Sequence, residues 1–173
     1  VSNCLIHPSV KVSEHQKVAS KIKAELDWCK ANINGSLATE LKKQYTLLCP
    51  TQSTKATFKQ ITETISQFLM NDEIKTIIMN GRTDVESDEY ATGCNFIIGG
   101  NTLGRGVTFP RLQTLYYTRT AKKPQADTMW QHSRMFGYDR DPGMMMVYID
   151  EPLYKLFADI NATNNAIIAQ VER

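Results

Sequence analysis

The hydrophobic positions of the first seventy residues recur with the spacing of α-helices. From an N-cap at Ser13 to about residue 32, apolar side chains return every three or four positions, which predicts an amphipathic helix. A second helix is predicted over residues 36–47, before Pro50, and a third from about Thr54. The apolar faces comprise Val18, Ile22 and Leu26 in the first helix, and Phe58, Ile61, Ile65, Phe68 and Leu69 in the third.

Short apolar runs of a second kind alternate with helical segments. One covers residues 3–9 and is ended by Pro8, and four more cover residues 74–80, 94–100, 112–118 and 144–150. Their length and their β-branched content predict buried strands. A helix is predicted over residues 127–136, and Pro152 opens a final helix over about 153–170. Because parallel strands need crossover helices, the alternation predicts an α/β fold with three α/β/α layers and a mainly parallel sheet.

Composition narrows the class of protein. The chain has 173 residues, 42% of them hydrophobic and 22% charged, with a net charge of +2. These values favour one globular domain over residues 1–173. They argue against disorder and against a strongly basic protein surface. The weak positive charge is compatible with nucleic-acid binding but does not indicate it. Because the chain begins with Val and a strand follows almost at once, we expect it to be a piece of a longer protein.

The cysteine content and the absence of targeting segments suggest a cytoplasmic protein. The sequence has four cysteines and no CxxC pair, so neither a zinc site nor a disulfide framework is indicated. No apolar run approaches the roughly 18 residues that a membrane span needs, and we expect no membrane partner. The cysteines are Cys4, Cys29, Cys49 and Cys94.

The glycine-rich stretch GGNTLGRG, residues 99–106, follows one of the predicted strands and resembles a phosphate-binding P-loop. Gly99 and Gly104 have the P-loop spacing, and a basic residue, Arg105, follows. However, Gly106 has no hydroxyl for magnesium, and Pro110 comes too early for the long helix that a P-loop opens. The alternatives are a glycine-rich connection with permissive backbone angles, or a different element that contacts phosphate.

A second polar segment favours a functional role for the glycine stretch. It covers residues 126–141 and reads ADTMWQHSRMFGYDRD. Gln131 and Arg134 are three residues apart and share a face of the predicted helix. Gly137 can end this helix and bring Arg140 toward the same place. In parallel α/β sheets, ligands gather at the carboxyl ends of the strands, which is where the glycine stretch lies.

Together the two segments resemble a known family. GGNTLGRGVTFP is similar to motif V of superfamily-two helicases, and QHSRMFGYDR is similar to their motif VI. More closely, the pair resembles the Z-one domain family, which carries the word endonuclease in its name and shows GGN-x-LSRG, YxxR and DTLMQMGRWFGYR. The matching residues are Gly99, Gly100, Asn101, Leu103, Arg105, Gly106, Tyr116, Arg119, Asp127, Thr128, Gln131, Arg134, Phe136, Gly137 and Tyr138. Three positions depart: Gly104 replaces Ser, Ser133 replaces Gly, and Asp139 replaces the last Arg, so that Arg140 is displaced by one residue.

The resemblance implies the second, C-terminal RecA-like half of a helicase or translocase, in a restriction or defence system. ATP and Mg²⁺ would be held mainly by a first RecA-like domain of the same protein, which this chain lacks. Arg134 and Arg140 would stabilise charge on the transferred phosphoryl group. Gln131 would position the γ-phosphate or the attacking water. The loop residues Gly104, Arg105 and Gly106 would lie near the nucleotide, and the chain would be inactive as an ATPase by itself.

The same loop is a candidate nucleic-acid contact. At a strand end, the amides and side chains of Asn101 and Thr102 can hold a backbone phosphate of DNA, with RNA left open. Such contacts read the backbone, so no sequence specificity is expected. Residues 7–9 are a weaker candidate for a further phosphate contact, against the simpler interpretation of a turn that ends a strand.

Two other functions compete with the motor hypothesis. The chain could be a non-catalytic RecA-like binding or scaffolding module, which the departures Ser133 and Asp139 favour. It could also be nuclease-associated, because metal-dependent nucleases need clustered carboxylates. The dense acidic cluster comprises Asp84, Glu86, Asp88 and Glu89, and a solvated acidic loop explains it more simply. We therefore assign no resident metal site.

Overall fold

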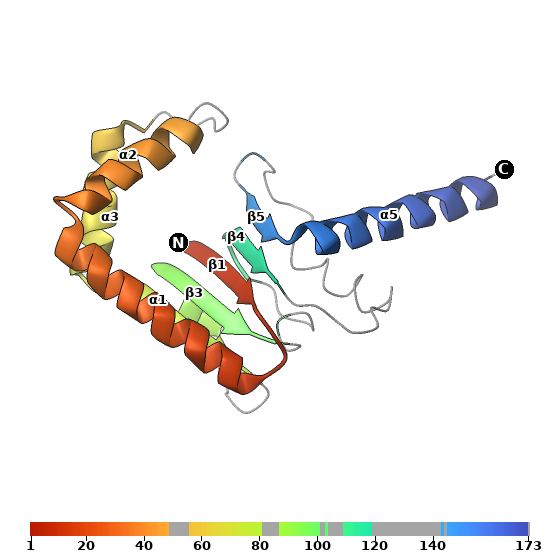
Figure 1. Cartoon of the computed structure of the whole chain (residues 1–173), viewed down its shortest axis with the longest axis horizontal. Helices are drawn as coiled ribbons and strands as arrows, with labels where there is room; N and C mark the ends of the chain where they lie inside the picture. Colours follow the sequence, from red (N-terminus) through yellow and green to blue (C-terminus); the bar gives the residue numbers. More distant parts are fainter. Residues whose placement is uncertain are drawn as a thin grey trace.

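A parallel sheet organises the chain. A computed structural model describes residues 1–48, 56–80, 87–100, 103, 109–118, 143 and 145–172. Within them, five strands pair in the order β2-β3-β1-β4-β5, and every pairing is parallel (Figure 1). The strands are β1 (Ser2–His7), β2 (Ile74–Met79), β3 (Cys94–Gly99), β4 (Leu112–Tyr117) and β5 (Met146–Ile149). The predicted α/β fold with a parallel sheet is confirmed.

The described helices lie close to their predicted positions. They are α1 (Val12–Asn32), α2 (Ser36–Leu48), α3 (Phe58–Met70) and α5 (Glu151–Val171), with a short 3₁₀ helix, η1 (Ser87–Tyr90), before β3. The predicted N-cap of α1 is wrong, because Lys11 holds that position and makes no side-chain capping bond. Thr57 caps α3 in a capping box with Gln60. The helix predicted over residues 127–136 lies outside the described residues.

Helices cover both faces of the sheet, which gives the predicted three layers. On one face, Ala19 of α1 packs with Ile6 and Ile98 of the central strands. On the opposite face, Leu153 of α5 joins a larger buried cluster with Leu5 of β1 and other strand residues. Side chains alternate between the two faces along each strand. The order of the strands decides which of the connecting loops lie next to one another at the carboxyl ends and at the amino ends of the strands.

The helical hairpin of α2 and α3 interrupts the strand–helix alternation. It packs at the C-terminal end of α1 around a separate small core formed by Ile33, Leu37 and Leu69 (Figure 1). This core contacts the sheet at the start of β2, where Ile74 is partly buried. The hairpin is thus attached at the amino edge of the sheet, away from the carboxyl ends of the strands.

The sequence predicts a buried strand over residues 144–150; the strand is confirmed, but its predicted burial is wrong. The strand is shorter, Met146–Ile149, and its central residues Val147 and Tyr148 are 40% and 48% exposed. In the described part of the chain, β5 has one strand neighbour, β4. Tyr148 lies beside Tyr116 of β4, with ring centroids 6.1 Å apart, and both rings are exposed. An apolar run at a sheet edge cannot be distinguished from a central strand by its sequence period alone.

Candidate functional site at the carboxyl edge of the sheet

The glycine stretch begins at the last residue of β3. Because all described strands are parallel, their carboxyl ends lie together on one side of the sheet, its carboxyl edge. There β3 lies between β2, an outermost strand, and β1, the central strand. Gly99 is in register with Met79, the last residue of β2. This edge is where ligands bind in open α/β sheets.

Close packing fixes the start of the loop. A Cβ atom at Gly99 would lie 2.5 Å from the Met79 carbonyl oxygen and 2.8 Å from Cγ of Leu103. Leu103 is 1% exposed and belongs to the large core cluster, and its amide donates to the carbonyl of Gly100 at 3.1 Å. The loop therefore starts from a buried anchor. Gly99 is required here for space, because among the described glycines Gly93 alone has a positive φ.

The turn after β1 closes on Gly100 from the other side. A Cβ atom at Gly100 would lie 3.2 Å from the Ser9 carbonyl oxygen, 3.3 Å from Cα of Val10 and 3.3 Å from Cε1 of His15. His15 lies in the first turn of α1, and its Nε2 is 2.7 Å from the same Ser9 oxygen. The start of the loop is thus enclosed by β2, by its own Leu103 and by the β1–α1 turn.

Residues 7–9 form a turn that ends the strand. The side chain of His7 is fully buried, and its ring lies edge-on to Tyr117 at a centroid distance of 5.2 Å. The hydroxyl of Ser9 accepts a hydrogen bond from the Lys11 amide at 3.1 Å. The backbone of Thr118 donates to the His7 carbonyl at 3.3 Å and so joins the ends of β1 and β4. Both side chains serve the fold, which supports the simpler interpretation of this segment.

The predicted site residues themselves lie outside the described residues. They are Asn101, Thr102, Gly104, Arg105, Gly106, Gln131, Arg134 and Arg140. The structure describes what flanks them, namely Gly99, Gly100 and Leu103 around the loop and Thr118 before the second segment. β4 ends at Tyr117, at the same carboxyl edge of the sheet as Gly99, the last residue of β3.

Comparison with known proteins identifies the family. A model of the Z1 domain matches residues 1–173. The chain belongs to the Z1 domain family. No curated protein and no solved structure matches it. The family match confirms the resemblance to the Z-one domain family, and it names a domain without naming a reaction.

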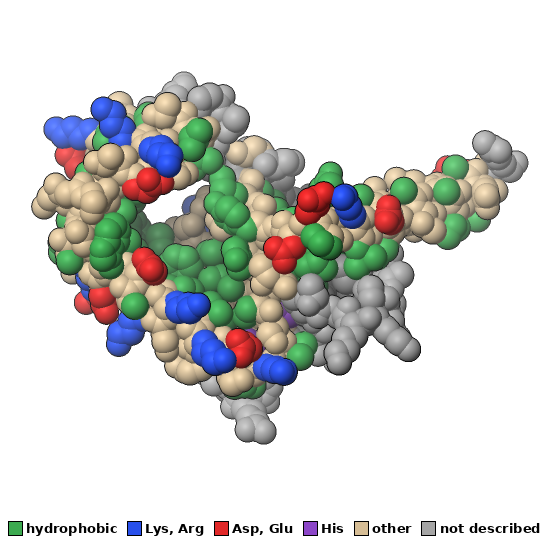
Figure 2. All heavy atoms as spheres, viewed as in Figure 1, with side chains coloured by type: hydrophobic (Ala, Val, Ile, Leu, Met, Phe, Trp, Pro, Cys, Tyr) green, Lys and Arg blue, Asp and Glu red, His purple; other side chains and the backbone are tan. Residues whose placement is uncertain are grey.

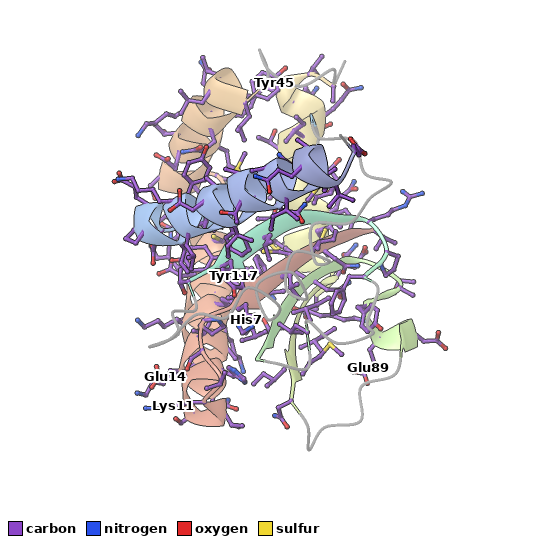
Figure 3. The ribbon with its side chains drawn as sticks, turned by 90° about the vertical axis from the view of Figure 1, so that its right-hand side faces the viewer. His7, Lys11, Glu14, Tyr45, Glu89 and Tyr117 are labelled. Carbon is purple, nitrogen blue, oxygen red and sulfur yellow. The ribbon has the colours of Figure 1, made fainter. Side chains whose placement is uncertain are left out.

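The described half of the acidic cluster lies at the opposite edge of the Z1 domain's sheet. Asp88 and Glu89 are exposed residues of η1, which precedes β3, and Figure 3 shows Glu89 across the sheet from His7 and Lys11. Asp84 and Glu86 are outside the described residues. Within the part of the chain that the structure describes, no group of three His, Cys, Asp or Glu side chains could hold a metal ion. The exposure of Asp88 and Glu89 agrees with a solvated acidic loop.

Two buried asparagines at this amino edge were not predicted. Asn3 and Asn95 are paired in register on β1 and β3, and the amide of Asn95 donates to Oδ1 of Asn3 at 2.8 Å. Asn3 in turn donates to the carbonyls of Tyr90 and Pro110, at 3.2 and 2.6 Å. These bonds tie the loops before β3 and β4 to the sheet. No local signal in the sequence reveals the pair, because its members are far apart along the chain.

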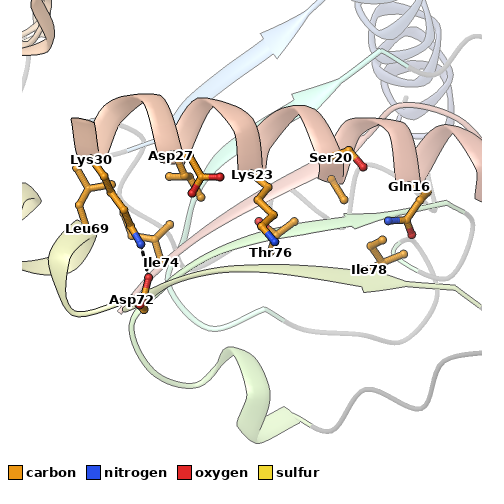
Figure 4. A pocket seen from close by; sticks show the side chains of 12 residues that line it. Gln16, Ser20, Lys23, Asp27, Lys30, Leu69, Asp72, Ile74, Thr76 and Ile78 are labelled. Carbon is orange, nitrogen blue, oxygen red and sulfur yellow. Dashed lines mark hydrogen bonds and ion pairs between the residues drawn. The ribbon is translucent and has the colours of Figure 1, made fainter. Parts of the chain in front are cut away.

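A groove lies between α1 and the edge strand β2, and Gly99, Gly100 and Leu103, the described residues of the glycine loop, do not line it (Figure 4). It encloses about 390 Å³ and has an apolar floor that includes Ile74 and Ile78. Its charged lining comprises Lys23, Asp27, Lys30 and Asp72, of which Lys30 and Asp72 form an ion pair. Because its two lysines are balanced by two aspartates, the groove has no preference for a phosphate-bearing ligand. Figure 2 likewise shows basic and acidic side chains interspersed along α1.

The described cysteines are poor nucleophiles. Burial raises the pKa of Cys4 to about 11, and burial is also the main cause of the raised pKa values of Cys29 and Cys94. With these raised pKa values the thiols stay protonated at neutral pH, and they react slowly because the thiolate is the reactive form.

In the described part of the chain, none of the helices is long and apolar enough to cross a membrane.

Proposed function

We propose that this Z1 domain is the second RecA-like motor half of a nucleic-acid-dependent ATPase, a helicase or translocase. The observation that carries the proposal is the position of Gly99 and Gly100. They start the loop at the carboxyl end of β3, beside the central strand, with Gly99 packed against Met79 and Leu103 and Gly100 against the turn that precedes α1. The parallel three-layer fold and the Z1 match over residues 1–173 support the same proposal.

In this function the domain completes an ATP site built mainly by a first RecA-like half. That half holds ATP and Mg²⁺, because this chain has no intact P-loop. Arg134, together with Arg140, stabilises the negative charge that develops on the transferred phosphoryl group. Such arginines are worth roughly 10³ to 10⁵ in rate. Gln131 orients the γ-phosphate or the attacking water.

The glycine loop links this chemistry to nucleic acid. Asn101 and Thr102 contact a backbone phosphate, and Gly104, Arg105 and Gly106 lie toward the nucleotide. A loop that touches both ligands couples their binding free energies, because each ligand then favours the same arrangement of the loop. Since backbone phosphates carry no sequence information, the stimulation of ATP hydrolysis is independent of DNA sequence.

The test is ATP hydrolysis by the full-length protein with and without single-stranded DNA. Arg134→Ala is expected to lower the DNA-stimulated kcat by about 10³ or more without weakening DNA binding, because it removes a charge that acts in the transition state. Arg105→Ala is expected to reduce the stimulation by DNA. Arg111→Asn is the matched control. It removes the same charge from an exposed residue at the amino edge, and Asn tolerates the left-handed backbone found there, φ 50°.

Full DNA-stimulated activity in the Arg134→Ala protein would exclude the motor function. A RecA-like module with a binding or scaffolding role would then be favoured. Equal losses in the Arg134→Ala and Arg111→Asn proteins would also count against the proposal, since they would indicate a general effect of charge or of stability.

A further inference from the structure

We infer that His15 is a positioning residue for the start of the glycine loop, at Gly99 and Gly100. It holds the turn after β1 against Gly100, and so fixes the backbone at the carboxyl end of β3. The effect of His15 on ATP hydrolysis rests on the proposed function. Its effect on the geometry of the loop does not.

The hydrogen bond of His15 defines its orientation. The side chain is 1% exposed, and Nε2 lies 2.7 Å from the carbonyl oxygen of Ser9. A carbonyl oxygen can only accept, so Nε2 carries the hydrogen and donates it. Nδ1 is buried and has no protein hydrogen-bond partner in the described part of the structure. The ring is therefore attached to the turn at one nitrogen and packed on its other sides.

The ring also forms part of the wall around Gly100. Its Cε1 atom, Ser9 O and Cα of Val10 all lie within 3.3 Å of the position that a Cβ atom at Gly100 would occupy. Contacts this close leave the backbone of Gly100 little room to move toward α1. On the other side, the hydrogen bond from Leu103 to the Gly100 carbonyl and the burial of Leu103 fix the loop to the core.

Removal of the ring would act on the loop through the turn. Without the imidazole, the Ser9 carbonyl loses its donor and a space opens beside Gly100, so the start of the loop gains freedom. Displacement of a binding loop by about 1 Å can cost as much as 10²-fold in rate, because the contacting groups no longer meet their ligand. His15 acts on the loop through Ser9 and Gly100 and not through contact with a ligand.

The test compares His15→Ala, His15→Gln and Gln16→Ala in the full-length protein. The side-chain amide of Gln can donate to the Ser9 carbonyl in place of Nε2, so His15→Gln is the rescue variant. Gln16 is an exposed neighbour on α1 and serves as the control. Two quantities are measured: hydrogen exchange of the peptide around Leu103, and the single-stranded DNA concentration that gives half-maximal stimulation of ATP hydrolysis.

In the His15→Ala protein, exchange at Leu103 is expected to accelerate by roughly ten-fold or more, since the hydrogen bond from its amide to the Gly100 carbonyl opens more often. The half-stimulating DNA concentration should rise by about ten-fold. His15→Gln should restore both values, and Gln16→Ala should change neither. A residue with a merely structural role would lower the active fraction and leave the half-stimulating DNA concentration unchanged, and that result would overturn the inference.

The two proposals fail in different ways. If Arg134→Ala leaves ATP hydrolysis intact, the motor function fails, and the role of His15 is judged by exchange at Leu103 alone. If Arg134→Ala abolishes hydrolysis while His15→Ala alters neither exchange nor the response to DNA, the inference fails and the motor function stands.

Discussion

At the scale of single residues, the space around the backbone decides at which glycines a side chain can be accommodated. One of the two interpretations left open by the sequence is that the glycines of residues 99–106 supply permissive backbone angles. The structure assigns Gly99 and Gly100 a different role, because neither has a positive φ and both are closely surrounded. Gly35, between α1 and α2, is the opposite case, since its nearest neighbour would be 3.7 Å from an added Cβ.

This contrast gives a stability prediction. Gly99→Ala is expected to lower the free energy of unfolding by about 1–3 kcal/mol, because its Cβ would collide with the Met79 carbonyl and with Leu103. Gly35→Ala should be neutral, or stabilising by about 0.4–1 kcal/mol, since it restricts the unfolded chain without a clash. Urea denaturation of the two variants checks this. Equal effects would show that the crowding at Gly99 is relieved by movement of its neighbours.

At the scale of elements, helix α5 has two unequal halves. Its N-terminal half packs on the sheet through Leu153 and Phe157, and the Phe157 ring meets Tyr117 at a centroid distance of 5.9 Å. Farther along the helix, Ile167 and Val171 are exposed, and Figure 1 shows that end extending away from the sheet. Tertiary contacts at its start therefore hold α5 to the domain.

Leu153→Ala is expected to cost about 2–5 kcal/mol of unfolding free energy, because it leaves a cavity between α5 and the sheet. Leu47→Ala, the same substitution at an exposed position of α2, is expected to change stability by no more than about 0.5 kcal/mol. Thermal and urea denaturation provide the measurement. A small loss for Leu153→Ala would mean that α5 contributes little to the fold.

At the scale of the whole molecule, partly buried thiols make stability depend on pH at the alkaline end. The pKa of Cys4 is raised from its ordinary value of 9.0 to about 11, so the unfolded chain ionises before the folded one. The stability that Cys4 contributes is complete below pH 9 and is lost as the pH rises through about 11. Cys29 and Cys94 shift in the same direction.

The prediction is that the free energy of unfolding falls more steeply between about pH 9 and 11 in the wild-type chain than in Cys4→Ala. Denaturant titrations at several pH values measure the two slopes, and lysines and tyrosines titrate alike in both proteins. In native protein, alkylation of Cys4 near pH 8 should be slow compared with unfolded protein. Parallel pH slopes together with fast alkylation would contradict the burial of this thiol.

Much of the fold was predictable because its signals are local. Helical spacing predicted α1, α2 and α3, and short β-branched runs predicted the five strands of the described sheet within a few residues. The exposure of strand β5 was not predicted, since an apolar run does not reveal how many neighbours its strand will have. The same limit applies to the site. Its glycine loop is visible as a motif, whereas the wall around Gly100 comes from residues far away in the chain.

His15 illustrates the division between sequence and tertiary structure. It lies four residues before Ala19 and three before Val18, so its place on the apolar face of α1 could have been found from helical spacing. The contact with Gly100 could not, because it depends on β3 pairing beside β1. The sequence by itself determined the elements, their parallel arrangement and the family motifs, all of which are encoded by local spacing. Only the tertiary structure decided the strand order and the enclosure of the glycine loop, because both arise from long-range packing.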